Sequence, residues 1–333
     1  MSEIDTLQTT SEIDTLQLVA VRRPFFEDEI RSLERERVSC TVLPVPGSEG
    51  RTPLAYARFQ AGIWRQTVGS EYDLVHAHYG LVGPSALAQP RRPVVITLWG
   101  SELYTRFRPL IEKATARADA VIVVSERIAE MLDQPCHVIP HGIDTDLFRP
   151  MPTDEAKAEV GWDSQTKHVI FPYDPNRSLK NYPLAESVVE MVDSDFDADV
   201  ELHAVYGVPH ERFPIYLNAS DALLLTSDHE GSPNAVKEAL ACNLPVVGVD
   251  VGDVPELLAG VRNCHVCEAE SELASRLAEV LESKSRADAR ERIEELSLER
   301  TGQKIRAVYE EVLDGSGDAE ETRFDEVASS YTK

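Results

Sequence analysis

The sequence is short of long apolar runs. None of its hydrophobic stretches approaches the roughly 18–20 residues that a membrane-spanning helix requires, and its first residues, Met1–Gln17, are polar and acidic, unlike a secretory signal. With 333 residues, 42% of them hydrophobic, the chain has the composition of a globular protein of two ordinary domains. We therefore expect a cytoplasmic protein, bound at most peripherally to the inner face of the cell membrane.

Basic residues are also scarce. Lys and Arg number 33 against 58 Asp and Glu, which gives a net charge of −25, and no lysine precedes Lys113. A surface this acidic repels phosphate groups, so we expect no nucleic-acid partner. Such acidity with little lysine is typical of proteins from a salt-loaded cytoplasm, where the charge is screened. We favour a halophilic archaeon as the source; an acidic mesophilic protein is the alternative.

Cofactor and metal motifs are missing as well. The sequence has five cysteines and one CxxC, Cys264–Cys267, without the second ligand pair that a structural zinc site needs. We interpret these cysteines as buried strand residues. No GxGxxG is present, which argues against a nicotinamide enzyme. The triplet Asp144-Thr-Asp146 has the form of a metal-binding DxD motif, but Asp is so frequent here that we attribute it to chance. We expect no metal and no cofactor.

Short apolar runs alternate with amphipathic segments through most of the chain. Runs such as Val121–Val124 are apolar at every position, which suits parallel strands covered by helices on both faces. The expected strands are Leu16–Val21, Cys40–Val45, Asp73–His78, Val94–Trp99, Ala120–Ser125, His137–Pro140, His168–Tyr173, Val200–Val205, Ala222–Thr226 and Pro245–Val249. The expected helices of the first half are Phe26–Arg37, Leu54–Val68, Glu102–Arg117 and Glu126–Asp133.

The alternation pauses near residue 150, where Pro150 and Pro152 precede a charged segment. We therefore predict an α/β protein of two facing Rossmann-like domains, each a doubly wound parallel sheet, with the active site in the cleft between them. The predicted parts are a disordered tail at 1–14, where Ser2–Gln8 recurs as Ser11–Gln17, an N-terminal domain at 15–150, a C-terminal domain at 151–313 and an acidic tail at 314–333.

The segment Thr226–Asp250 carries the strongest site signal. Ser232 is a good N-cap and Pro233 fits the first helical position, so a short helix is predicted over Asn234–Ala241. The free amides at such a helix start attract anions. Glu230 precedes the helix and Glu238 follows Asn234 by four residues, so a carboxylate lies on each side of the amides, which suits the hydroxyls of a ribose and of a sugar. Two solvated surface glutamates are the alternative.

This segment resembles the E-x7-E signature of glycosyltransferase family 4, a retaining family of GT-B fold. Other stretches resemble that family in order: Asp73–His78, Val94–Ser101, Asp119–Ser125 and Val138–Pro150. The resemblance implies that Arg177 and Lys180 bind the donor diphosphate and that Glu230 and His78 contact the transferred sugar. It assigns donor binding to the residues around the helix start and on its first turns: Gly231, Ser232, Pro233, Asn234, Ala235 and Glu238.

The implied activity is metal-independent transfer of a hexose from a nucleoside-diphosphate sugar, such as a UDP-sugar, to a glycan or lipid-linked acceptor in cell-envelope synthesis. Two departures affect the acceptor side: Arg22–Glu27 replaces the family's Gly-Gly loop, and Trp99 stands where the family often has histidine. A non-catalytic partner subunit and a nucleotide-sugar epimerase of the same fold are the alternatives.

Overall fold

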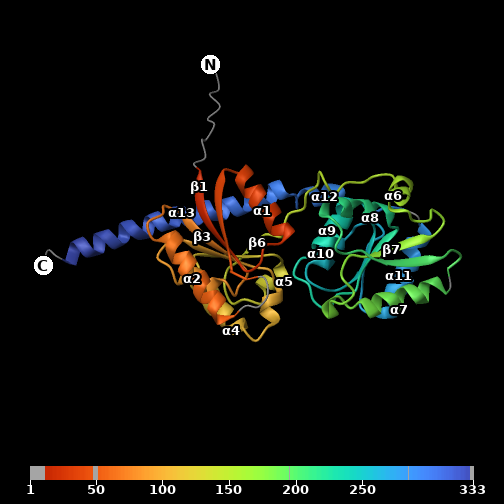
Figure 1. Cartoon of the computed structure of the whole chain (residues 1–333), viewed down its shortest axis with the longest axis horizontal. Helices are drawn as coiled ribbons and strands as arrows, with labels where there is room; N and C mark the ends of the chain where they lie inside the picture. The colour runs from red at the N-terminus through yellow and green to blue at the C-terminus, as the bar shows by residue number, and fades with distance from the viewer. Residues whose placement is uncertain (1–11, 48–51, 195, 284, 331–333) are drawn as a thin grey trace, which may run out of the picture. The chain divides into compact units, whose positions relative to one another are not determined.

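A computed structural model describes residues 12–47, 52–194, 196–283 and 285–330 (Figure 1). The chain divides into two compact units. The N-terminal unit comprises the chain up to Val123, Leu132–Ile139 and the segment from Thr301 onward. The C-terminal unit comprises Val124–Met131 and Pro140–Arg300. The first copy of the repeated heptapeptide lies outside the described residues.

The N-terminal unit is built on a six-stranded sheet with the order β2-β1-β3-β4-β5-β6, in which every pair is parallel. Its strands are β1 (Ile13–Val19), β2 (Val38–Pro44), β3 (Leu74–His78), β4 (Val94–Leu98), β5 (Ala120–Val123) and β6 (His137–Val138). Its helical elements are α1 (Pro24–Arg35), α2 (Pro53–Thr67), α3 (Gly83–Leu87), the 3-10 turn η1 (Ser101–Tyr104), α4 (Arg108–Thr115) and most of α13 (Leu298–Ser330).

The C-terminal unit has a five-stranded parallel sheet with the order β11-β10-β9-β7-β8. The strands are β7 (Lys167–Phe171), β8 (Val200–Ala204), β9 (Ala222–Leu225), β10 (Val246–Val249) and β11 (His265–Cys267). The helical elements are α5 (Glu126–Ala129), α6 (Thr153–Val160), η2 (Ser178–Lys180), α7 (Tyr182–Asp193), η3 (His210–Arg212), α8 (Phe213–Ala219), α9 (Asn234–Ala241), α10 (Val254–Leu258), α11 (Glu270–Ser283) and α12 (Arg290–Glu294).

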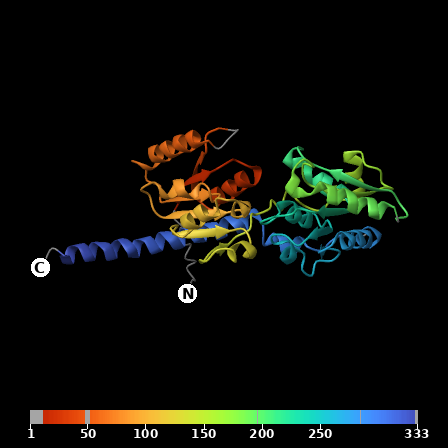
Figure 2. The same ribbon diagram turned by 90° about the horizontal axis from the view of Figure 1, so that it is seen from below.

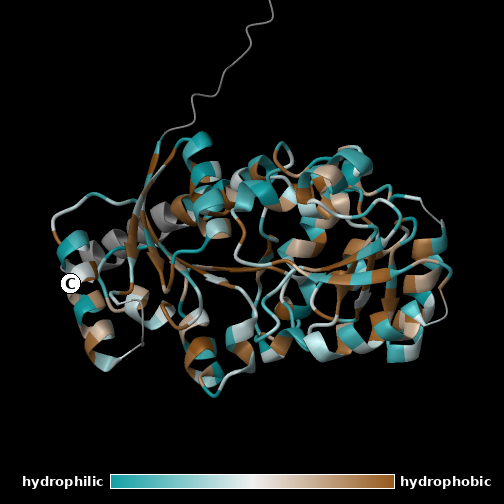
Figure 3. Ribbon diagram, turned by 45° about the vertical axis from the view of Figure 1, so that its right-hand side comes forward, coloured by the Kyte–Doolittle hydropathy of each residue, from teal (hydrophilic) through white to brown (hydrophobic). Residues whose placement is uncertain are grey.

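Both faces of the C-terminal sheet are buried, as the continuous apolar runs predict. Along β7, Val169 and Phe171 belong to the apolar cluster that includes α7 and α11, whereas Ile170 belongs to the cluster that includes α8 and α9. Successive side chains of a strand point to opposite faces, so the two clusters lie on the two sides of the sheet. Figure 2 shows this unit from below, and Figure 3 shows its strands largely in brown and its helices in bands of teal, white and brown.

Strand order reverses at one point in each sheet. In the N-terminal unit it reverses between β1 and β3, and in the C-terminal unit between β7 and β9. Connections on either side of such a point leave the sheet toward opposite faces, which opens a crevice beyond the carboxyl ends of the two strands. The segments that follow β7 and β9 are therefore the ones placed to bind a ligand in the C-terminal unit.

The predicted α/β class and all ten predicted strands are confirmed, with ends that differ by up to three residues. Strand β1 begins at Ile13, inside the predicted tail. The short strand β11 was absent from the prediction, although Cys267 is buried there as expected of a strand cysteine. The predicted helix Glu102–Arg117 is wrong in its middle, because the first turn ends at Tyr104 and α4 begins only at Arg108, next to Pro109.

The predicted domain boundaries need correction at the end of the chain. Helix α13 belongs to the N-terminal unit from Thr301 onward, not to the C-terminal domain, and it runs through the predicted acidic tail to Ser330. Tyr309 is fully buried in the N-terminal core, and Gly302 lets the helix approach α1, since a Cβ there would lie 3.0 Å from the Ser32 carbonyl oxygen. Among the described residues, no helix combines the length and apolarity needed to cross a membrane.

Candidate functional site

The loops after β7 and β9 are tied together by hydrogen bonds. The Thr226 hydroxyl, just past β9, donates to the carbonyl oxygens of Lys180 and Asn181, both at 3.0 Å. The amide of Asp228 donates to the Leu179 carbonyl at 3.0 Å. These bonds fix the turn that carries Lys180 against the loop that carries Glu230, at the point where strand order reverses.

Glu230 and Lys180 form an ion pair through Oε1 of the glutamate. The Tyr173 hydroxyl donates to the same oxygen at 3.2 Å, and the Lys180 ammonium lies 3.8 Å from the centre of the Tyr173 ring. Burial lowers the pKa of Lys180, and Glu230 opposes this shift. Burial and the Glu230 carboxylate raise the pKa of Tyr173 well above its usual value, so its hydroxyl stays protonated and can donate.

Arg177 lies in the same turn, with its guanidinium carbon 5.8 Å from the centre of the Tyr173 ring. Its side chain is exposed, whereas Lys180 is 5% exposed. The structure thus brings both predicted cations to the turn after β7 and near the Tyr173 ring, and it pairs Lys180 with Glu230. The Arg177 charge also contributes to lowering the pKa of Lys180.

The start of α9 differs from the prediction in its cap. Pro233, not Ser232, occupies the N-cap position, and its carbonyl accepts from the amides of Val236 and Lys237. The amides of Asn234 and Ala235 therefore precede the helix's own hydrogen bonds, as those of a helix start must. The Asn234 Oδ1 atom is buried beside them and has no hydrogen-bond partner among the described residues. The helix ends as predicted, before Asn243 with φ +53°.

Ser232 has another partner, because its hydroxyl donates to Asp253 Oδ2 at 2.6 Å. The two loops meet closely at Gly252, whose φ is +56°, and a Cβ at that position would lie 2.5 Å from the Gly231 carbonyl oxygen. Only glycine tolerates both the left-handed backbone and this approach. Ser232 and Gly231 thus shape the loop before α9 rather than cap the helix.

Glu238 lies one turn into α9 and is 8% exposed. Its Oε1 lies 3.5 Å from Nε2 of His210, whose ring packs 5.3 Å from that of Phe148. The Glu238 charge also helps to raise the pKa of Tyr173, so both glutamates lie within electrostatic reach of one tyrosine. This placement contradicts the alternative of two solvated surface residues.

The sequence analysis assigned no role to Lys237, which immediately precedes Glu238 in α9. Its side chain is completely buried. Its ammonium donates to the His141 carbonyl at 2.8 Å, which ties α9 to the segment Val138–Pro150. Burial lowers the pKa of Lys237 to about 8 and raises that of nearby Asp253 to about 6, while each charge partly offsets the shift of the other. Tyr173 and His210 were also overlooked, because neither belongs to a motif.

The predicted sugar contact at His78 is not supported. His78 is fully buried in the N-terminal unit, with Nε2 2.6 Å from Gln17 Oε1 and Nδ1 3.3 Å from Glu29 Oε1. Neighbouring His76 is equally buried and contacts Tyr309 and Thr97. Both histidines end β3 as predicted, but their ring nitrogens face protein partners. These contacts fit a structural role in the N-terminal core.

Asp144 holds a turn. Its Oδ1 accepts from the amides of Asp146 and Leu147 at 3.1 and 2.9 Å. The Asp144 carboxylate thus stabilises the local turn. The cysteines Cys264 and Cys267 are unbridged, and burial raises the pKa of each thiol, to about 12 and about 11.

The sequence matches two family descriptions, Glycosyltransferase Family 4 over residues 17–147 and Glycosyl transferases group 1 over residues 183–283. TuaC of Bacillus subtilis, described as a glycosyltransferase of teichuronic acid biosynthesis, is 30% identical over 220 residues, 56% of this chain and 55% of TuaC. The chain thus spans little more than half the length of TuaC. The lipopolysaccharide core biosynthesis mannosyltransferase LpsB of Rhizobium meliloti is 27% identical over 250 residues, 65% of this chain and 70% of LpsB.

Solved structures share the fold. HepE of Anabaena, solved with UDP and glucose, has a TM-score of 0.70 at 16% identity and covers 90% of this chain and 100% of its own. Sucrose-phosphate synthase of Thermosynechococcus elongatus has a TM-score of 0.65 at 15% identity, with 94% of this chain and 99% of its own covered. The first match lies mainly in the N-terminal unit, and the second lies in the C-terminal unit and includes the E-x7-E helix. Together they show that the chain is a glycosyltransferase of the family 4 type, with the GT-B fold.

Proposed function

We propose that the protein transfers a hexose from a nucleoside-diphosphate sugar to a glycan or lipid-linked acceptor, with retention of the anomeric configuration. The observation that carries the proposal is the pairing of Glu230 with Lys180 beside the free amides of α9, where β7 and β9 end. Cations and helix-start amides suit a diphosphate, and carboxylates suit hydroxyl groups. Both chemistries meet at this one place.

The donor diphosphate would lie against Lys180, Arg177 and the amides of Asn234 and Ala235. In the free protein, Glu230 neutralises the Lys180 ammonium. A diphosphate brings more negative charge than one carboxylate and would take over that contact. As the bond from the sugar to the phosphate breaks, charge grows on the leaving oxygen, and fixed cations and amides stabilise such charge strongly. No divalent metal is then required.

The two glutamates would hold the two ends of the donor. Glu238, buried beside His210, would accept hydrogen bonds from the ribose hydroxyls. At Glu230 the contacts from Tyr173 and Lys180 both fall on Oε1, which leaves Oε2 for the hydroxyls of the hexose. In the reaction the C1–phosphate bond breaks, the acceptor oxygen bonds to C1 on the same face, and the acceptor's proton passes to the leaving phosphate. No protein base takes part.

The relatives suggest the donor and the acceptor. HepE was solved with UDP and glucose, so a UDP-sugar is the first donor to test. TuaC and LpsB are named for teichuronic acid and lipopolysaccharide core synthesis, both of which are envelope glycans. We therefore place the acceptor in an envelope glycan or its lipid-linked precursor at the membrane surface.

The test is transfer by the purified chain from a panel of UDP- and GDP-sugars to lipid and glycan extracts, with the anomeric configuration of the product read by NMR. Lys180→Ala should lower turnover by about 10²-fold, because it removes a cation aimed at the leaving group. Glu190→Gln, an exposed carboxylate change on α7, is the matched control and should leave turnover unchanged.

Three outcomes would contradict the proposal. An epimerised nucleotide-sugar formed without acceptor would indicate an epimerase of the same fold. Nucleotide binding with no turnover on any acceptor would indicate a non-catalytic subunit. Turnover that is lost in EDTA and restored by Mg²⁺ or Mn²⁺ would show that the transfer step needs a metal.

A further inference from the structure

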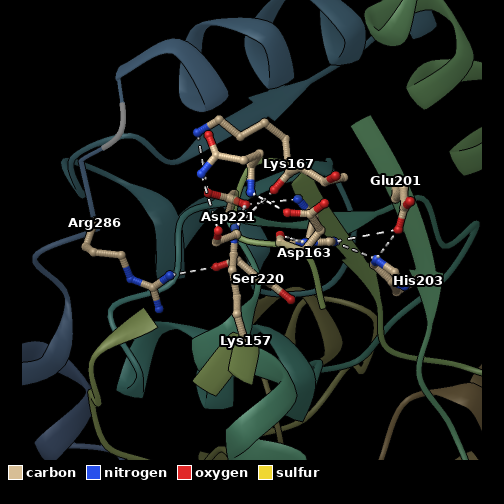
Figure 4. Close-up of polar contacts among 12 residues, drawn as sticks. Lys157, Asp163, Lys167, Glu201, His203, Ser220, Asp221 and Arg286 are labelled. Carbon is tan, nitrogen blue, oxygen red and sulfur yellow. Dashed lines mark hydrogen bonds and ion pairs between the residues drawn. The ribbon is translucent and has the colours of Figure 1, made fainter. Parts of the chain in front are cut away.

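Three side chains with metal-binding atoms converge at the amino end of the C-terminal sheet. His168 is the second residue of β7, and Glu201 and His203 lie two residues apart on neighbouring β8, so that both point to one face. His168 pairs with Glu201 in the strand register. Figure 4 shows His203 and Glu201 side by side near Asp163. The cluster lies at the opposite end of β7 from Tyr173, about 16 Å away at the usual rise of a strand.

The three ligand atoms lie within 4.8 Å of one another. Nδ1 of His168 is 2.8 Å from Nε2 of His203, Nε2 of His203 is 3.4 Å from Glu201 Oε2, and Nδ1 of His168 is 3.9 Å from the same oxygen. The His168 side chain is 1% exposed, that of His203 21% and that of Glu201 58%. The cluster is thus rigid at its base and open to solvent at the glutamate.

The contact made by Nε2 of His168 determines which ring nitrogen of His168 carries the hydrogen. Nε2 lies 2.7 Å from the Asp163 carbonyl oxygen, which can only accept, so Nε2 carries the hydrogen and the Nδ1 lone pair faces His203. Metal-binding histidines characteristically donate their second N–H to a carbonyl in this way. Trp162 stacks on the His203 ring at 3.9 Å and 17°, which restricts how that ring turns.

We propose that His168, His203 and Glu201 bind a zinc ion, with water as the fourth ligand. Two histidines and one carboxylate are a common zinc set, and bonds of 2.0–2.2 Å place tetrahedral ligands about 3.3 Å apart. The His203–Glu201 separation already has this value, the His168–Glu201 distance is within about 0.6 Å of it, and the two histidine nitrogens must open by about 0.5 Å. The metal takes the place of the proton that the two rings now share.

A metal at this site would stabilise the β8 edge of the C-terminal sheet. Strand β8 is the outer strand beside β7, and a metal bound by side chains of both strands resists fraying of that edge. We do not propose a metal site at the neighbouring charged residues in Figure 4. Lys157 and Lys167 pair with Asp221, and Arg286 donates to the Ser220 carbonyl, so these side chains already bind protein partners.

The experiment is calorimetric titration of the chelator-treated chain with Zn²⁺ in 2 M KCl, which screens diffuse attraction of cations to the acidic surface. We expect one zinc per chain and a rise of a few degrees in melting temperature. His203→Gln should lose the binding, and Glu201→Gln should weaken it at least tenfold. His137→Gln, a histidine of the N-terminal unit beside Glu311, is the control and should bind as wild type does.

Co²⁺ then reports the ligand type. The proposal predicts visible bands of a tetrahedral nitrogen and oxygen site without a thiolate charge-transfer band, and a change in Trp162 fluorescence that is absent in His203→Gln. A thiolate band, which would place the metal at Cys264 and Cys267, overturns the proposal. So does unchanged zinc affinity in His203→Gln and Glu201→Gln, or the absence of zinc binding by wild type. Glu201 is too exposed for its amide variant to unfold the chain, so the test stays decisive.

Discussion

The two units reverse their strand order in the same way, yet the polar groups at the two reversal points differ. At the end of β3 in the N-terminal unit, His76 and His78 are fully buried and contact Gln17, Glu29 and Tyr309. After β7 and β9 in the C-terminal unit, Arg177 is exposed, and the amides at the start of α9 lie outside the helix's own bonds.

The difference separates two uses of buried polarity. Polar groups that bond one another inside a core stabilise the fold, because each partner relieves the cost of burying the other. Groups that keep bonding capacity toward an accessible surface can bind a ligand. On this criterion we interpret the N-terminal cluster as structural and propose the C-terminal cluster as the donor site. Substitutions in each cluster should therefore change different quantities.

The largest effect is expected for Glu238→Ala. If Glu238 holds the ribose, the variant loses a charge-assisted contact worth roughly 1.5–3 kcal/mol, so the free nucleoside diphosphate should bind about 10–150-fold more weakly. Calorimetry with UDP and GDP measures this. The control is Glu190→Gln, and equal affinity in Glu238→Ala and wild type would remove Glu238 from the donor site.

Tyr309→Phe should affect stability and leave nucleotide affinity unchanged. Gln17 Nε2 donates to the Tyr309 hydroxyl at 3.3 Å, and that hydroxyl lies 2.6 Å from His76 Nδ1. Removing it leaves two buried groups without this partner, at a cost of about 1–2 kcal/mol. Urea unfolding should show a lower midpoint with an unchanged slope. Tyr206→Phe, an exposed tyrosine, is the control, and equal midpoints in both variants would argue against a structural cluster.

Sequence patterns predicted the strands and the short helix Asn234–Ala241 because both are local. A run such as Val121–Val124 is apolar at every position, and a helix start places its own amides whatever lies around it. Contacts between elements that lie far apart in the sequence could not be predicted from such patterns. Local patterns do not say that α13 covers the N-terminal sheet, and the approach of His210 to Glu238 depends on how η3 and α9 meet. An E-x-H pattern on a strand, Glu201-Leu-His203, was the one available signal for the metal cluster.

The third prediction concerns acid stability of the N-terminal cluster. Burial, together with His78, holds the pKa of His76 well below the usual 6.5. Below pH 6.5 the His76 side chain therefore binds a proton in the unfolded chain but not in the native chain. The free energy of unfolding falls as pH decreases from 6.5 toward the folded pKa, by at most about 1.4 kcal/mol per pH unit. Urea midpoints at pH 7.5 and 5.5 should differ more in wild type than in His76→Gln. Identical pH dependence in the two proteins would contradict a neutral, buried His76.

The smallest effect is expected where the charge looks most important, at Glu230 with bare nucleotide. Glu230 forms an ion pair with Lys180 in the free protein. Glu230→Ala therefore removes a group that competes with the diphosphate for the Lys180 ammonium. If Glu230 faces the hexose, the nucleoside diphosphate lacks its partner, and affinity should stay within about threefold of wild type, or about 0.7 kcal/mol. Turnover with the sugar donor should still fall, because contacts at the reacting ring act on the transition state. Calorimetry with UDP and kinetics with the UDP-sugar separate these quantities. A loss of nucleotide affinity as large as that of Glu238→Ala would place both carboxylates on the nucleotide and end the distinction between them.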